Sequence, residues 1–207
     1  TAVGRLAFPI FAYQVAEGFF LTHNRKKYLG RMFVFALISE IPFNLLYYSS
    51  VVFPFHQNVM FTFFIALLLM LGLEKVRSKG AGLYILAAVL SLPVGYFLGT
   101  LGMVDYYGSG VVTVLIFYLC RQIPHGWIGE VAGLAFLNCK LLGGMTIPLT
   151  LGSWTLEFPE QGLALLALIP IWLYNGRQGA HNKAIQYACY AFYPAHMLIL
   201  ALLRMYL

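Results

Sequence analysis

The first apolar stretch of the chain, residues 4–20, constrains most strongly what the sequence can fold into. Its sequence is GRLAFPIFAYQVAEGFF, long enough to cross a bilayer, which takes about 20 apolar residues. It nevertheless carries Arg5 near one end and Glu17 near the other, about 18 Å apart along a helix. A charge in hydrocarbon costs at least ~2.5–3.5 kcal/mol, and Pro9 leaves a backbone carbonyl for neighbours to satisfy. The stretch therefore predicts a membrane helix that other helices must surround.

The composition indicates that the whole chain is such a bundle. Hydrophobic residues make up 61% of the 207 residues and charged residues 10%, whereas a soluble domain carries about 25% charged residues. We expect residues 1–207 to form a single integral-membrane domain in contact with the lipid bilayer. The net charge of +6 lies in short loops, which favours a membrane topology signal over nucleic-acid binding.

Eight apolar segments follow one another along the chain and predict an all-α, polytopic transmembrane helix bundle. The loops between them alternate: the odd-numbered loops are basic, whereas the second and fourth contain no Lys or Arg. Under the positive-inside rule this alternation places the odd loops in the cytoplasm and residues 1 and 207 outside it, in a multi-pass protein of the inner membrane. The eight predicted spans are residues 3–22, 28–48, 58–74, 81–100, 109–120, 127–147, 161–174 and 184–206.

Five polar residues within or beside these spans are candidates for a buried catalytic site: Arg5, Glu40, Asn58, Thr62 and His196. Arg5 and Glu40 fall at a similar outer depth on consecutive spans, and we expect them to form an ion pair. Asn58 and Thr62 share one helix face and could equally bond a neighbouring helix. His196 falls near the membrane middle, either as a base or as a histidine satisfied within the core.

Other reactive side chains favour simpler interpretations. His56 stands at a loop edge and is expected to be solvated. Cys120, Cys139 and Cys189 fall in apolar segments without metal-ligand spacing, so the sequence predicts buried thiols and no metal site.

Short blocks spread over the whole chain resemble the TraX family. They begin with GRLAFPIF, EGF and RKKY in residues 4–28, and they continue in family order to the last predicted span. The later blocks are SEIPF at 39–43, QNVMFT at 57–62, DYYG at 105–108, LALIP at 166–170, YNGR at 174–177 and FYPAH at 192–196.

The resemblance implies an activity that the composition does not. TraX proteins are polytopic membrane proteins associated with N-terminal acetylation of conjugative pilin, and they resemble transmembrane acyltransferases that use cytoplasmic acyl-CoA. Members usually begin with a further span that carries an Asp-His pair. This sequence opens at Thr1 without that span. We therefore expect an upstream segment that carries this span. If its histidine is the catalytic base, residues 1–207 would be inactive alone.

The resemblance makes acetyl-CoA the expected acyl donor and a pilin-like peptide amine or an envelope polymer the expected acceptor. Cations and an amide near the cytoplasmic ends of the spans are the candidates for holding the CoA phosphates. Two alternatives stay open: a transporter of small solutes or lipids, although no inverted repeat is visible, and a non-catalytic membrane scaffold of an assembly system. The candidate donor-binding residues are Arg25, Lys26, Arg31, Asn175 and Arg177.

Overall fold

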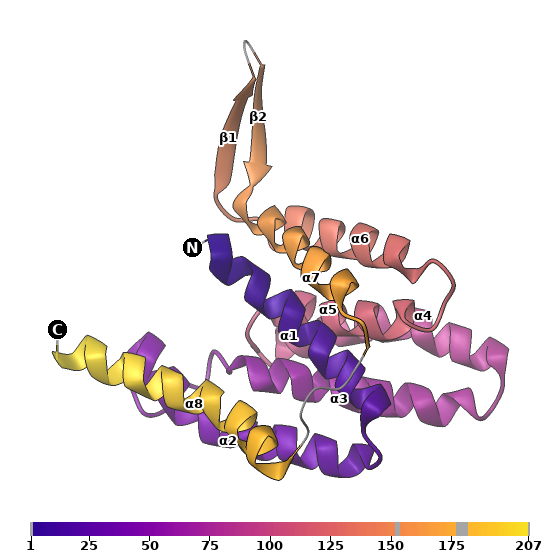
Figure 1. Ribbon diagram of the computed structural model, residues 1–207, viewed down its shortest axis with the longest axis horizontal. Helices are drawn as coiled ribbons and strands as arrows, with labels where there is room; N and C mark the ends of the chain where they lie inside the picture. The colour runs from indigo at the N-terminus through magenta and orange to yellow at the C-terminus, as the bar shows by residue number, and fades with distance from the viewer. Residues whose placement is uncertain (1, 152–153, 177–181, 207) are drawn as a thin grey trace.

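The protein is a bundle of antiparallel helices with one projecting β-hairpin (Figure 1). The computed structural model describes residues 2–151, 154–176 and 182–206. The longer helices are α1 (Ala2–Leu21), α2 (Arg25–Tyr48), α3 (Val59–Arg77), α4 (Ala81–Leu101), α5 (Tyr107–Cys120), α6 (Gly126–Phe136) and α8 (Lys183–Tyr206). The remaining elements are the π-helical turn η1 (Leu137–Leu141), strands β1 (Thr146–Leu151) and β2 (Trp154–Pro159), the 3₁₀ helix η2 (Glu160–Ala167) and the short helix α7 (Leu168–Leu173).

Helix α5 forms the centre of the bundle and packs against α1, α3, α4 and α6. Its side chains are buried nearly all round, as expected for a helix without a polar face. Small residues allow α4 to approach closely: a Cβ on Gly108 would lie 2.1 Å from the carbonyl oxygen of Tyr96. Close backbone approach at small residues is a common way for membrane helices to associate, because lipid provides little hydrophobic drive between them.

The outer surface of the bundle is apolar, as a membrane protein requires. On α4, for example, Ile85, Val89 and Phe97 are each more than 60% exposed. Among the described residues, α2, α3, α4 and α8 are long and apolar enough to cross a membrane. The predicted fold class, an all-α membrane bundle, is therefore confirmed. Helix length and composition support four spans among the described residues.

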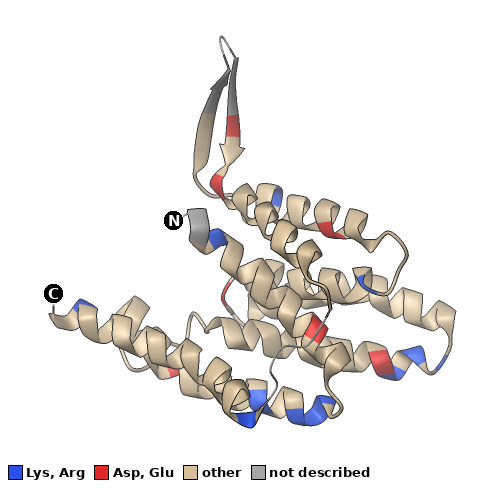
Figure 2. Cartoon of the chain, in the orientation of Figure 1, with Lys and Arg blue, Asp and Glu red and all other residues tan. Residues whose placement is uncertain are grey.

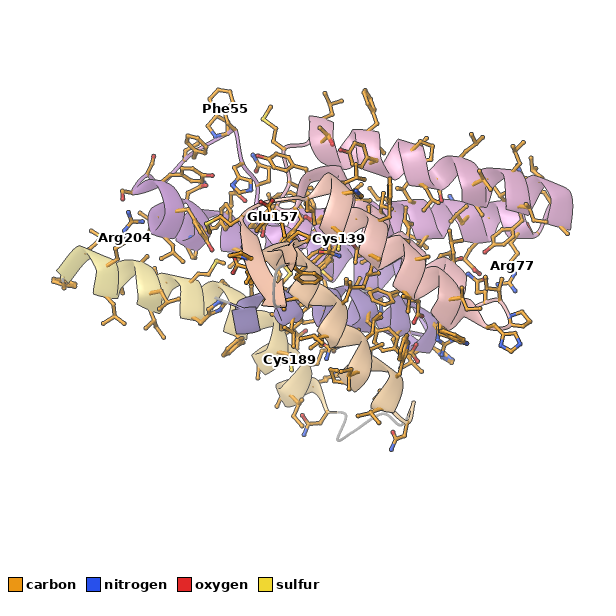
Figure 3. All side chains as sticks on the ribbon, turned by 90° about the horizontal axis from the view of Figure 1, so that it is seen from above. Phe55, Arg77, Cys139, Glu157, Cys189 and Arg204 are labelled. Atoms are coloured by element: carbon orange, nitrogen blue, oxygen red, sulfur yellow. The ribbon has the colours of Figure 1, made fainter. Side chains whose placement is uncertain are left out.

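Most basic residues lie at one end of the bundle (Figure 2). We call this the basic end and define it by Arg25, Lys26, Lys27, Lys75, Arg77, Lys79, Arg121 and Lys183. The opposite end, which we call the loop end, holds the loops 49–58 and 102–106 and the hairpin. Figure 3 shows Arg77 at the basic end, with Phe55 and Arg204 at the other end.

The predicted sixth span, residues 127–147, is wrong in extent. Helix α6 ends at Phe136, passes through the π-helical turn and gives way to the hairpin rather than to a loop. Gly143 and Gly144, both with positive φ, end the helical path. The strands then pair in antiparallel register from Thr146–Pro159 to Leu151–Trp154. The predicted seventh span at 161–174 corresponds to η2 and α7 together.

Candidate active site

A cavity of about 550 Å³ lies between α8 on one side and α1, α2 and α3 on the other. It arises because α8 packs closely along α2 and leaves space beside α1. Near the basic end it is lined by Gln186, and at the loop end by Asp105. On α8, His196 lies ten positions after Gln186, a rise of about 15 Å along the helix. The cavity therefore extends through much of the depth of the bundle.

His196 lines this cavity from the middle of α8. Its Nδ1 atom lies 2.8 Å from the carbonyl oxygen of Phe192, one helical turn earlier. A carbonyl oxygen only accepts hydrogen bonds, so Nδ1 carries the hydrogen and Nε2 holds the lone pair of the neutral ring. The hydrogen bond to the backbone, which the sequence offered as the alternative to a catalytic role, thus leaves Nε2 as the basic nitrogen.

Tyr193, one turn from His196 on the same helix, adds a phenol to the cavity wall. Its ring centroid lies 5.6 Å from that of His196. The hydroxyl approaches the backbone N–H of Val59 at the start of α3, but it makes no well-aligned hydrogen bond among the described residues. The hydroxyl is therefore a hydrogen-bond donor without a partner among the described residues, on a side chain that lines the same cavity as His196.

Asn58 and Thr62 lie outside this cavity, and their hydrogen bonds hold helices together. Asn58 caps α3 by accepting from the backbone N–H of Met60, and its Nδ2 donates to the Ala36 carbonyl at 2.9 Å and to Glu40 Oε2 at 2.6 Å. The expectation that it bonds a neighbouring helix is confirmed. The Thr62 hydroxyl donates to the backbone carbonyl of Asp105 at 2.7 Å. The side chains of Asn58 and Thr62 are therefore engaged in hydrogen bonds between elements of the bundle.

The predicted partner of Arg5 is wrong. Arg5 does meet a carboxylate, but it is Glu160 of η2, at 3.3 Å, and Arg5 also donates to Gln161. Glu40 instead accepts from Asn58, and its other oxygen is buried without a hydrogen bond in the described structure. Depth alone suggested the pairing of Arg5 with Glu40, whereas η2 packs directly on α1 and brings its carboxylate closer.

The candidate donor-binding residues are not gathered at a single opening. Arg25 forms an ion pair with Glu74 at 2.8 Å and lies over the Phe19 ring, and Lys26 is exposed. Arg31 lies close to Tyr190 on the wall of the cavity, and Asn175 follows α7. Arg177 lies outside the described residues. Among the four of these residues that the structure describes, Arg31 is thus the one next to the cavity.

A second cavity of about 400 Å³ lies between α1 and α7 toward the basic end. Gln14 of α1 lines both cavities. Glu17, which lines the second cavity, forms a bidentate ion pair with Arg121. Arg121 Nε donates to Oε2 at 2.5 Å and Nη2 donates to Oε1 at 2.9 Å. The sequence placed Glu17 on the inner half of the first span but gave no partner for it.

Three side chains that were not among the predicted site residues lie close together at the loop end: Tyr48, His56 and Asp105. The Tyr48 hydroxyl lies 2.5 Å from His56 Nδ1, and His56 Nε2 lies 3.7 Å from Asp105 Oδ1. The expectation that His56 is merely solvated is wrong, because two loops are tied together there. The N–H of Gln57 donates to the Met103 carbonyl, and the N–H of Asp105 donates to the Gln57 carbonyl, each at 2.9 Å.

Tyr106, next to Asp105, closes the loop end of the cavity. Its ring stacks on Phe8 of α1 with a centroid separation of 4.0 Å. Burial, with a further contribution from the Asp105 charge, raises the pKa of Tyr106 to about 12. The phenol therefore stays protonated at physiological pH and can act as a hydrogen-bond donor.

The prediction of three buried thiols is confirmed for Cys120 and wrong for Cys189. Cys120 is buried, Cys139 is intermediate and Cys189 is exposed; all three are free thiols. Cys189 lies on α8, as Figure 3 shows, and lines the larger cavity. The described residues contain no cluster of side chains suited to a metal ion.

The sequence match agrees with this architecture. The model of the TraX protein family matches residues 1–204. The chain belongs to the TraX family. It is also 30% identical to a protein of Dichelobacter nodosus described as "Probable fimbrial assembly protein FimC, serogroup H1", over 99% of this chain and 82% of that relative. No solved structure matches it.

Proposed function

We propose that this TraX-family chain is a membrane-embedded acetyltransferase. It takes the acetyl group of cytoplasmic acetyl-CoA and transfers it to a pilin-like peptide amine or another cell-envelope acceptor. The main support for the proposal is the position of His196. Its side chain lines a cavity that extends from the basic end toward the loop end, and its Nε2 is the basic nitrogen. Membership of the TraX family supports the choice of reaction.

In the proposed reaction the acceptor amine attacks the thioester carbonyl carbon. The new C–N bond forms, His196 Nε2 removes the proton from the attacking nitrogen, and the C–S bond breaks. The imidazolium then returns the proton to the CoA sulfur, so the products are the acetylated amine and CoA thiol. General-base assistance of this kind contributes typically 10²–10⁴-fold in rate. The Tyr193 hydroxyl is suited to donate to the carbonyl oxygen as negative charge develops.

The donor enters from the basic end in this proposal. Arg31 beside the cavity, exposed Lys26 and Arg177 provide positive charge for phosphate groups, and the Asn175 amide can donate hydrogen bonds to them. Arg25 is less suited than the sequence suggested, because Glu74 already neutralises it. The pantetheine arm of CoA is long enough to cover the roughly 15 Å from Gln186 to His196.

The acceptor is proposed to arrive at the loop end, across the membrane from the donor. The relative from Dichelobacter nodosus carries the name of a fimbrial assembly protein, which favours an acceptor in pilus or conjugation assembly. The positive-inside rule supports placement in the inner membrane with the basic end facing the cytoplasm.

The test is transfer of labelled acetyl from acetyl-CoA to envelope proteins and polymers in membranes that contain the full-length protein. His196→Ala should lower transfer by about 10²–10⁴-fold while acetyl-CoA binding is retained. Arg177→Ala should weaken acetyl-CoA binding instead. His23→Ala, an exposed histidine in the loop before α2, is the matched control and should transfer at the wild-type rate. Wild-type transfer by both His196→Ala and Arg177→Ala would end the proposal.

A non-catalytic role in assembly is the second candidate. It is favoured by the side chains of Arg5, Asn58 and Thr62, which are engaged in contacts between elements of the bundle. The same membranes distinguish the two roles. A scaffold would transfer no label in any variant, and pilus assembly would survive His196→Ala.

A further inference from the structure

The group of Tyr48, His56 and Asp105 at the loop end meets the larger cavity through Asp105. We propose that His56 and Asp105 form a proton-accepting pair that neutralises the acceptor ammonium before the amine attacks the thioester. The inference rests on the proposed acetyltransferase function and assigns a role to two residues in addition to His196.

The position of Asp105 suits the recognition of a cation. Its side chain is about one-third exposed and lines the loop end of the cavity. Its Oδ1 accepts from the backbone N–H of Tyr106 at 3.1 Å and faces His56 Nε2 at 3.7 Å. A carboxylate on the wall of a mostly apolar cavity attracts an ammonium group and can accept its N–H hydrogen bonds.

Neighbouring polar groups at this end are already engaged. Glu40 accepts from the side chain and the backbone of Asn58, and Arg5 is held by Glu160 and Gln161. Among the described residues, Asp105 is the one carboxylate that lines the cavity.

His56 is held so that it can take up a proton on the side of Asp105. Tyr48 lies 2.5 Å from Nδ1, and Asp105 lies 3.7 Å from Nε2. In the tautomer that the proposal uses, Nδ1–H donates to the phenol oxygen and the Nε2 lone pair faces the carboxylate. The ring is fixed between Tyr107, which stacks on it at a centroid distance of 6.0 Å, and the edge contact with Phe43 at 5.3 Å. The imidazolium formed by protonation would donate to both Asp105 and Tyr48.

The proton balance of the reaction shows what such an acceptor would do. An ammonium R–NH₃⁺ and acetyl-CoA give R–NH–acetyl, CoA–SH and one free proton. That proton passes from the ammonium through the Asp105 carboxylate to His56 Nε2, and it leaves from Nδ1 by way of Tyr48 to water. The neutral amine then attacks, and His196 moves the second proton from the nitrogen to the CoA sulfur. His196 alone therefore does not account for the released proton.

The test compares two peptides that differ only in the acceptor nitrogen. One has an ordinary N-terminal α-amine, of which about one molecule in ten is neutral at pH 7. The other ends in an aminooxyacetyl group, whose nitrogen is unprotonated at that pH. His56→Gln and Asp105→Asn should each lower kcat/KM for the ordinary amine by about tenfold, the inverse of its neutral fraction, and leave the aminooxy peptide unchanged. His23→Gln should alter neither.

Activity on the aminooxy peptide also reports that each variant is folded. An equal loss on both peptides, or no loss on either, would overturn the assignment and leave His56 as a structural residue. Wild-type membranes that acetylate neither peptide would instead remove the proposed acetyltransferase function, and the proton-accepting pair with it.

Discussion

Replacing Arg121 should destabilise the protein far more than replacing its partner Glu17. The Glu17 carboxylate is almost completely buried and accepts two hydrogen bonds from Arg121, whereas the Arg121 side chain is 41% exposed. Without Arg121, the carboxylate stays buried and unpaired, which costs about 3–5 kcal/mol. Without Glu17, the guanidinium can still reach water and keeps its position over the Phe20 ring.

We therefore expect Arg121→Gln to lower the free energy of unfolding by about 3 kcal/mol, the lower bound of that range, because Glu17 borders a cavity and Arg121 is 41% exposed. Glu17→Gln should cost about 1 kcal/mol, the net value of an ordinary hydrogen bond. The double variant should be more stable than Arg121→Gln alone, since the unpaired charge is gone.

The measurement is unfolding in mixed detergent micelles with increasing sodium dodecyl sulfate, followed by far-ultraviolet circular dichroism. Lys27→Gln, an exposed residue at the same end of the bundle, is the control and should change the free energy of unfolding by less than about 0.5 kcal/mol. Equal costs for the two single variants, or a double variant less stable than Arg121→Gln, would refute the reasoning.

Two further predictions concern packing and access to the cavity. Gly108→Ala should destabilise the bundle by about 3 kcal/mol or more, because the added Cβ would meet the Tyr96 backbone at 2.1 Å. The matched change Gly72→Ala, where nothing lies within 4 Å, should be neutral or stabilising in the same unfolding assay. Equal effects of the two changes would contradict the close contact of α4 and α5. Cys189 should react with a small maleimide, whereas buried Cys120 should not. Acetyl-CoA should slow labelling of Cys189 in membranes, because that thiol lines the proposed donor path, and unchanged labelling at saturating acetyl-CoA would argue against the path.

The candidate site was only partly visible in the sequence. His196 could be found, because its position twelve residues into a span places it at mid-depth. The role of His56 could not, because it depends on two loops far apart in the sequence, 49–58 and 102–106, being joined by the backbone hydrogen bonds of Gln57 with Met103 and Asp105. A histidine in one loop and an aspartate in another at the same predicted depth is the available sequence signal, and it is too common to be decisive.

The amino-acid sequence by itself determined that this protein is a membrane bundle and which end of each helix is basic. Both properties follow from position along the chain: apolar length fixes a span, and the charges that flank it fix its ends. Tertiary structure alone decided which side chains meet at a given depth. Arg5 pairs with Glu160 rather than Glu40, and Glu17 with Arg121, because lateral neighbours depend on the order in which helices pack and on how each is rotated. The same lateral order places α8 against α2. It thereby leaves the cavity that both His196 and Asp105 line.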